Sequence, residues 1–166
     1  MAVRHVTKIS SLTRPEVAGV LRLALDMKAR PEDYHDALKR KTLLMLFEKP
    51  SLRTRVSLEA GMTSLGGHGI AYMTGDSPIG VKESYEDTGA VLSRMADAVT
   101  ARVKSRDQIA GLAANAAQLA ANAYANARRD PYFRQRSPRC LGASGAVNAA
   151  VAYGCLMNPW RLIIVF

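Results

Sequence analysis

A short run of cationic and hydroxyl side chains follows an apolar segment near residue 50. Ser51, Arg53, Thr54 and Arg55 lie there, with Lys49 just before them. If a helix begins at this point, its first N–H groups are unpaired and the positive end of its dipole lies there, so the helix start can bind an anion. An arginine fork also matches a phosphate in geometry and charge. These residues indicate an oxyanion site. The alternative is a solvated helix start in a basic protein, because most helix N-termini bind nothing.

Three apolar runs predict the strands that position this cluster. They cover residues 42–47, 69–73 and 98–103, and the first is continuous enough to be buried on both faces. Ser51 is expected to cap a helix that continues to about Leu65. The order strand, helix, strand, helix, strand, helix predicts an α/β fold with a parallel sheet flanked by helices. In such a sheet, ligands bind outside the carboxyl ends of the strands.

Capping motifs and glycines also predict where the helices begin and end. Thr13-Arg14-Pro15-Glu16 is a capping box that predicts a helix ending before Pro31, and Gly66-Gly67 predicts a left-handed end to the helix after Ser51. Ser84 and Ser105 resemble further N-caps. Helical spacing predicts the inward-facing residues: Val17, Val20, Leu21, Ala24 and Leu25 in the first helix; Val56, Ala60 and Leu65 in the second; Tyr85, Thr88, Leu92 and Met95 in the third.

Four linked stretches within about residues 40–105 resemble the carbamoyl-phosphate domain of the aspartate and ornithine carbamoyltransferases. The first, Phe47 to Arg55, is similar to the family's phosphate-binding signature, and its Phe-Glu-Lys start is similar to the ornithine branch. The others are Leu65-Gly66-Gly67-His68, the stretch from Gly80 to Thr88, and the stretch from Val91 to Val103. They stand in the family's order and spacing, which makes the combination specific.

The resemblance implies a reaction and a site. Ser51, Leu52 (through its backbone N–H), Arg53 and Thr54 would hold the phosphate of carbamoyl phosphate, and Arg102 would reach both the phosphate and the carbamoyl oxygen. The second substrate would be ornithine, and the products citrulline and phosphate. No metal or organic cofactor would be needed. The catalytic unit would be a homotrimer, in which the loop 76–82 reaches into a neighbour's site.

The chain also departs from the family. Leu52 replaces a common threonine and removes one hydroxyl donor but keeps the backbone N–H. Pro78 has neither a polar side chain nor an N–H donor, so the contact that the family makes there with a neighbour's phosphate is not expected. No histidine follows His68, so the family's His-Pro-x-Gln element is missing, and so is a recognisable ornithine-binding domain.

The resemblance fades at about Asn115. We expect a carbamoyl-phosphate domain over residues 1–114 and an atypical Ala/Arg-rich tail over 115–166. Residues 110–127 contain ten alanines, and the chain after Lys104 carries seven basic and two acidic residues, a balance of +5 out of a total of +9. A frameshift or premature end, or a diverged short relative, would explain this change.

Two other classes of function remain open. One is a carbamoyl-phosphate- or phosphate-binding module without turnover. The other is a nucleic-acid-binding protein, which the net charge of +9 suggests; the 6% of aromatic residues do not interleave with the Arg cluster as a stacking platform would.

Two cysteines and three histidines without ligand spacing argue against a metal site. Without a signal-like or membrane-spanning segment, we expect a cytoplasmic protein.

Overall fold

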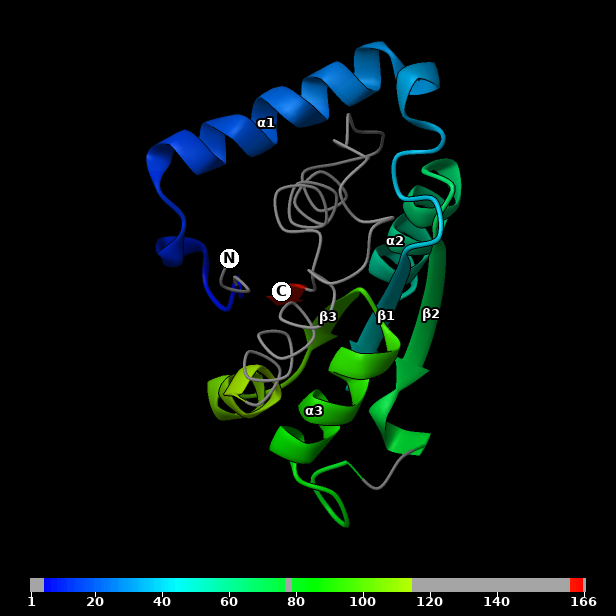
Figure 1. Ribbon diagram of the computed structural model, residues 1–166. Helices are drawn as coiled ribbons and strands as arrows, with labels where there is room; N and C mark the ends of the chain where they lie inside the picture. Colours follow the sequence, from blue (N-terminus) through cyan, green and yellow to red (C-terminus); the bar gives the residue numbers. More distant parts are fainter. Residues whose placement is uncertain (1–4, 77–78, 115–161, 166) are drawn as a thin grey trace, which may run out of the picture.

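The computed structural model describes residues 5–76, 79–114 and 162–165. Its centre is a parallel sheet in the order β2-β1-β3-β4 (Figure 1). The strands are β1 (Thr42–Phe47), β2 (His68–Met73), β3 (Ala98–Arg102) and β4 (Leu162–Val165). The predicted α/β class is therefore confirmed, and the first three strands agree with the predicted runs to within one residue.

Helices connect the strands. They are α1 (Arg14–Ala29), α2 (Leu52–Ser64) and α3 (Tyr85–Met95), followed by a helical segment over residues 106–114, and three short 3₁₀ turns lie at Ile9–Ser11, Pro31–Tyr34 and Thr74–Asp76. The predicted boundaries follow from local chemistry. Glu16 accepts the backbone N–H of Thr13 at 2.6 Å, and Gly66 has a φ of 75°, a left-handed conformation that glycine adopts without strain.

β1 divides the core into two halves. Leu43, Met45 and Phe47 face the cluster that contains residues of α1 and α2, whereas Leu44 and Leu46 face the cluster with α3 and Leu112. Successive side chains of a strand point to opposite faces, so a strand buried on both sides must be apolar throughout. All five of these residues are at most 8% exposed, as the continuous apolar run predicted.

The inward faces of the helices were predicted less well. Val17, Leu21 and Leu25 of α1 are 37%, 50% and 69% exposed, and Val56 and Met95 are 52% and 75% exposed. Ala60 is also exposed. The residues that α1 and α2 bury are Val20, Met27, Leu58, Gly61 and Met62. A helix with apolar residues on more than one side has two candidate faces, and only its docking angle on the sheet decides between them.

Asp97 links β1 and β3 at the end of the sheet where these strands begin. Its carboxylate accepts the N–H of Thr42 at 3.0 Å and pairs with the Lys41 Nζ at 2.8 Å, while its own N–H donates to the Thr42 carbonyl at 3.0 Å. β1 and β3 are thus tied together before their ladder begins.

The crossing of α3 with residues 106–114 requires a glycine. A Cβ placed at Gly89 would lie 2.2 Å from the Leu112 carbonyl oxygen, whereas one at Gly75 would meet nothing within 4 Å. The backbones approach so closely there that no side chain fits between them.

We therefore predict that Gly89→Ala lowers the free energy of unfolding by about 1–3 kcal/mol, the usual cost of overpacking, although alanine is the better helix former. Gly75→Ala is the matched control and should change it by less than about 0.5 kcal/mol. Chemical denaturation of both variants measures this. Equal stability of the Gly89 variant and the parent chain would contradict the close crossing.

Candidate functional site

Ser51 and Arg102 meet at the carboxyl edge of the sheet. Phe47 and Arg102 are partners in the parallel ladder between β1 and β3, so the chain leaves both strands at the same level. The Nη1 group of Arg102 donates a hydrogen bond to Ser51 Oγ, although the two residues are 51 positions apart in the sequence. The structure thus brings together the two predicted site residues that the sequence separates most.

The role of the Ser51 hydroxyl differs from the one expected. Ser51 occupies the N-cap position of α2 with φ −147° and ψ 85°, yet its side chain makes no capping hydrogen bond. It faces Arg102 instead. The N–H groups of the first turn of α2 therefore keep their capacity to bind an anion beside a guanidinium group.

The remaining signature residues lie on that first turn. Leu52 is 78% exposed, Arg53 is exposed, and Thr54 is half-buried. Arg55 leaves the cluster: its Nε lies 3.1 Å from Glu59 Oε1, one helical turn further on. The sequence places Arg53 and Arg55 together at the predicted oxyanion site, but in the structure Arg55 pairs with Glu59, because residues four apart on a helix surface are neighbours.

Glu48 and Lys104 also lie at the candidate site, although no role was predicted for either from the sequence. Glu48 follows β1 and Lys104 follows β3; the Lys104 Nζ lies 2.8 Å from Glu48 Oε1, and the Lys104 N–H donates to Glu48 Oε2 at 2.6 Å. Both line a cavity of about 250 Å³ together with Lys49, Arg102 and Val103. Their position directly after neighbouring parallel strands is the signal that could have found them.

The charges in this cavity are mostly positive. Lys49, Arg102 and Lys104 stand against one carboxylate, that of Glu48. The hydrogen bond from the Lys104 side chain lowers the pKa of Glu48 below its usual value of 4.5, and the same bond raises the pKa of Lys104. The pair is therefore ionised at neutral pH, and the cavity keeps the positive charge that an anion requires.

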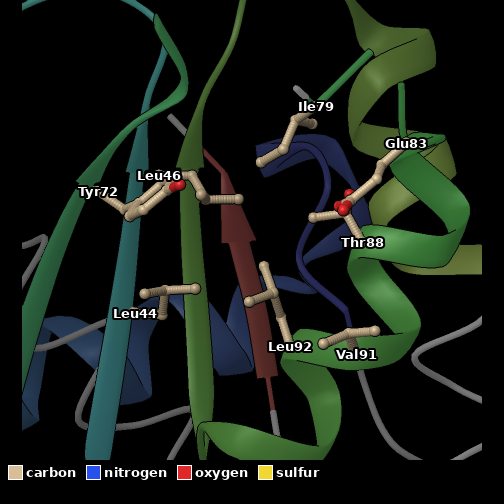
Figure 2. A pocket seen from close by; sticks show the side chains of 8 residues that line it. All are labelled: Leu44, Leu46, Tyr72, Ile79, Glu83, Thr88, Val91 and Leu92. Atoms are coloured by element: carbon tan, nitrogen blue, oxygen red, sulfur yellow. The ribbon is translucent and has the colours of Figure 1, made fainter. Parts of the chain in front are cut away.

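A second cavity, of about 160 Å³, lies between the sheet and α3 and is mainly apolar (Figure 2). Leu44 and Leu46 of β1, Tyr72 of β2 and Leu92 of α3 converge on it. Its lining carries no cation, so it is not a second phosphate site.

Other expectations concern features away from the two cavities. In the part of the chain that the structure describes, no group of three His, Cys, Asp or Glu residues is placed to hold a metal ion. Likewise, none of the described helices is both long and apolar enough to cross a membrane. Pro78, Cys140 and Cys155, and residues 115–161 of the expected tail, lie outside the described residues.

Two serines at N-cap positions provide a test of the Ser51 geometry. Ser84 Oγ accepts the N–H of Asp87 at 3.0 Å and so caps α3, whereas Ser51 caps nothing. We predict that Ser84→Ala lowers the free energy of unfolding by about 1 kcal/mol and that Ser51→Ala costs less than half of that. Urea denaturation of both variants measures the difference. A full capping loss in the Ser51 variant would show that its hydroxyl bonds α2 rather than Arg102.

Comparison with known proteins gives a consistent result. Residues 4–132 match the family model of the carbamoyl-P binding domain of aspartate/ornithine carbamoyltransferase. The catabolic ornithine carbamoyltransferase of Halobacterium salinarum is 41% identical over 114 residues, which are 69% of this chain and 39% of that protein. The ornithine carbamoyltransferase of Shewanella oneidensis is 40% identical over 111 residues, 67% of this chain and 37% of that protein.

Solved structures agree. The structure of ornithine carbamoyltransferase from Pyrococcus furiosus superposes with a TM-score of 0.64 at 37% identity, over 69% of this chain and 37% of that one. Ornithine transcarbamoylase from Giardia lamblia gives 0.60 at 43% identity, over 68% and 34%. The chain thus spans 34% to 39% of the length of these relatives. It belongs to the aspartate/ornithine carbamoyltransferase family and carries that family's carbamoyl-phosphate binding domain.

Proposed function

We propose that the site binds carbamoyl phosphate for transfer of its carbamoyl group to the amine of ornithine, giving citrulline and phosphate. The observation that carries the proposal is the Arg102–Ser51 hydrogen bond at the carboxyl edge of the sheet, beside the open first turn of α2. A guanidinium group, a hydroxyl and helix N–H groups gathered at one place are suited to a phosphate. The ornithine branch is favoured by the similarity of the Phe47-Glu48-Lys49 segment and by the names of the relatives above.

Each residue has a role in this proposal. Ser51, Arg53, Thr54 and the N–H of Leu52 bind the phosphate, and Arg102 extends from the phosphate to the carbamoyl oxygen. The neutral amine attacks the carbamoyl carbon, the carbon–oxygen bond to phosphate breaks, and phosphate leaves with the electron pair and takes up the proton that the amine nitrogen loses. Negative charge develops on the carbamoyl oxygen in the transition state. A cationic donor already in place there lowers the barrier, because it need not reorganise during the reaction.

A second candidate function is binding without turnover. It is favoured by the absence of any histidine after His68, which leaves the His-Pro-x-Gln element without its histidine. We propose residues 1–114 as the carbamoyl-phosphate-binding domain and 115–166 as an atypical tail, of which residues 162–165 add β4 to the sheet beside β3. Under this candidate, carbamoyl phosphate binds but citrulline does not form. A colorimetric assay for citrulline in the presence of both substrates separates the two functions, and citrulline formation by the purified chain would refute the second.

The phosphate site itself is tested by binding. Arg53→Ala and Arg102→Ala each remove a charge-assisted hydrogen bond and should weaken carbamoyl phosphate binding by about 10- to 100-fold, equivalent to about 1.5–3 kcal/mol. Arg22→Ala removes the same charge from the exposed surface of α1 and should leave the affinity unchanged. Isothermal titration calorimetry of the three variants beside the parent chain measures this. Equal loss in all three would indicate a general charge effect, as in a nucleic-acid-binding protein.

We further propose that the chain forms a homotrimer. Four apolar side chains on the α3 side of the sheet are well exposed: Ile70 (41%), Tyr72 (39%), Val91 (50%) and Met95 (75%). Tyr72 and Val91 also border the apolar cavity of Figure 2. An exposed apolar surface of this kind is typical of a protein–protein contact.

We predict that Val91→Lys converts the trimer to monomer, because a charge at the contact would be desolvated without a partner. Leu21→Lys, at an equally exposed position (50%) on α1, should not change the assembly. Sedimentation velocity of the parent chain and both variants gives the masses. A monomeric parent chain at all concentrations would contradict the trimer. We also propose a role in arginine biosynthesis, and a cytoplasmic location remains a prediction.

A further inference from the structure

Glu48 bonds the segment 102–104 through both its backbone and its side chain. Its backbone N–H donates to the Arg102 carbonyl at 3.0 Å, and its carboxylate receives the Lys104 N–H at 2.6 Å and the Lys104 ammonium at 2.8 Å. The Arg102 side chain in turn reaches Ser51, which follows Glu48 by three positions in the sequence. These links close a ring between residues 48–51 and residues 102–104.

The burial of the pair is uneven, and this decides its effect. The Glu48 side chain is only 14% exposed, whereas that of Lys104 is 63% exposed. Glu48 cannot relax into water if its partner is lost, so an unpaired carboxylate would remain beside the cavity that Arg102 and Lys49 line. Such a charge would both repel an anion and attract the Arg102 guanidinium away from Ser51.

We infer that Glu48 and Lys104 are positioning residues of the anion site: their ion pair fixes Arg102 beside Ser51 and neutralises the carboxylate that lines the cavity. The inference rests on the proposed function, because it assumes that an anion binds at Arg102. It adds a requirement that the phosphate signature does not contain. Neither residue needs to touch the anion, since both act through the backbone of residues 102–104 and through the local charge.

The chain offers a matched control at the other end of the same two strands. The Lys41–Asp97 pair also joins β1 to β3, with an Nζ–Oδ1 distance of 2.8 Å, but it lies where the strands begin. If an ion pair matters only because it holds β1 and β3 together, removing either one should have the same effect on the site. If position at the carboxyl edge matters, only the Glu48–Lys104 pair should affect anion binding.

The experiment is a calorimetric titration of the full chain with sulfate at constant ionic strength. Sulfate is tetrahedral like phosphate and keeps its charge over the pH range used, so any pH dependence comes from the protein. Lys104→Met should weaken sulfate binding about tenfold at pH 7, because it leaves the Glu48 charge uncompensated close to the anion. Lys104→Arg should restore most of the affinity, and Lys41→Met should leave it unchanged.

The pH profile distinguishes positioning from simple loss of a charge. Lys49, Arg102, Lys104 and Gln108 are the charged and polar groups around Glu48, and Gln108 Nε2 also donates to the hydroxyl oxygen of Tyr85 in α3 at 2.6 Å. In Lys104→Met, the pKa of Glu48 returns upwards because its largest stabilising contact is gone. Affinity in that variant should therefore recover as the pH falls from 7 towards 4.5, while the parent chain shows no such recovery.

Glu48→Gln provides a second test when it is combined with Lys104→Met. It removes the charge that Lys104 neutralises, so Lys104→Met should cost much less in the Glu48→Gln background than alone. Parent-like affinity of Lys104→Met, or an equal loss in Lys41→Met, would overturn the inference while leaving the phosphate site intact. If the parent chain itself fails to bind sulfate, or if Arg102→Ala binds as well as the parent, both this inference and the proposed function are wrong.

Discussion

The parallel ladder between β1 and β3 determines where every residue of the site lies. Phe47 is paired with Arg102, and both strands end at that level. The next residues of each strand, Glu48 and Val103, therefore leave the sheet side by side. A register shift of one residue would turn the Arg102 side chain to the other face of the sheet, because side chains alternate along a strand. The contact of Arg102 with Ser51 and the link between Glu48 and Lys104 both depend on this one register.

The fixed register in turn depends on the burial of β1 on both faces. Met45 and Leu43 are at most 1% exposed on one side, and Leu46 is 2% exposed on the other. A strand packed in this way cannot change its register without exposing apolar side chains on one face and leaving cavities on the other. At its start, the bonds of Asp97 to Thr42 and Lys41 fasten the same pair of strands. A rigid sheet thus supports a site built from the short turns that follow it, which is the usual way in which parallel sheets present polar groups to a ligand.

The cavity at the candidate site is lined by three cations and one carboxylate that partly balances their charge. Lys49, Arg102 and Lys104 surround a cavity of about 250 Å³, and a cluster of like charges without a counter-charge would repel itself. Glu48 reduces this repulsion, and the hydrogen bond from the Lys104 side chain lowers the Glu48 pKa below its usual value. Arg55, which the sequence places among the anion-binding residues, is neutralised locally by Glu59. The structure therefore selects a few cations of the basic signature for the site and pairs others on the surface.

Local sequence patterns were sufficient to predict the class of fold, strands β1 to β3 to within one residue, the helix caps at Thr13 and Ser84, and the resemblance to the family. These features depend on local chemistry, such as capping hydrogen bonds, the continuous apolar run of a doubly buried strand, and glycine at a positive φ. The buried face of α1, the bond of Ser51 to Arg102 instead of a cap on α2, and the contact of Glu48 with Lys104 could not be predicted in this way. The docking of α1 on the sheet sets the first of these. The other two join segments more than 50 residues apart, and their geometry depends on the strand register, which no local pattern encodes.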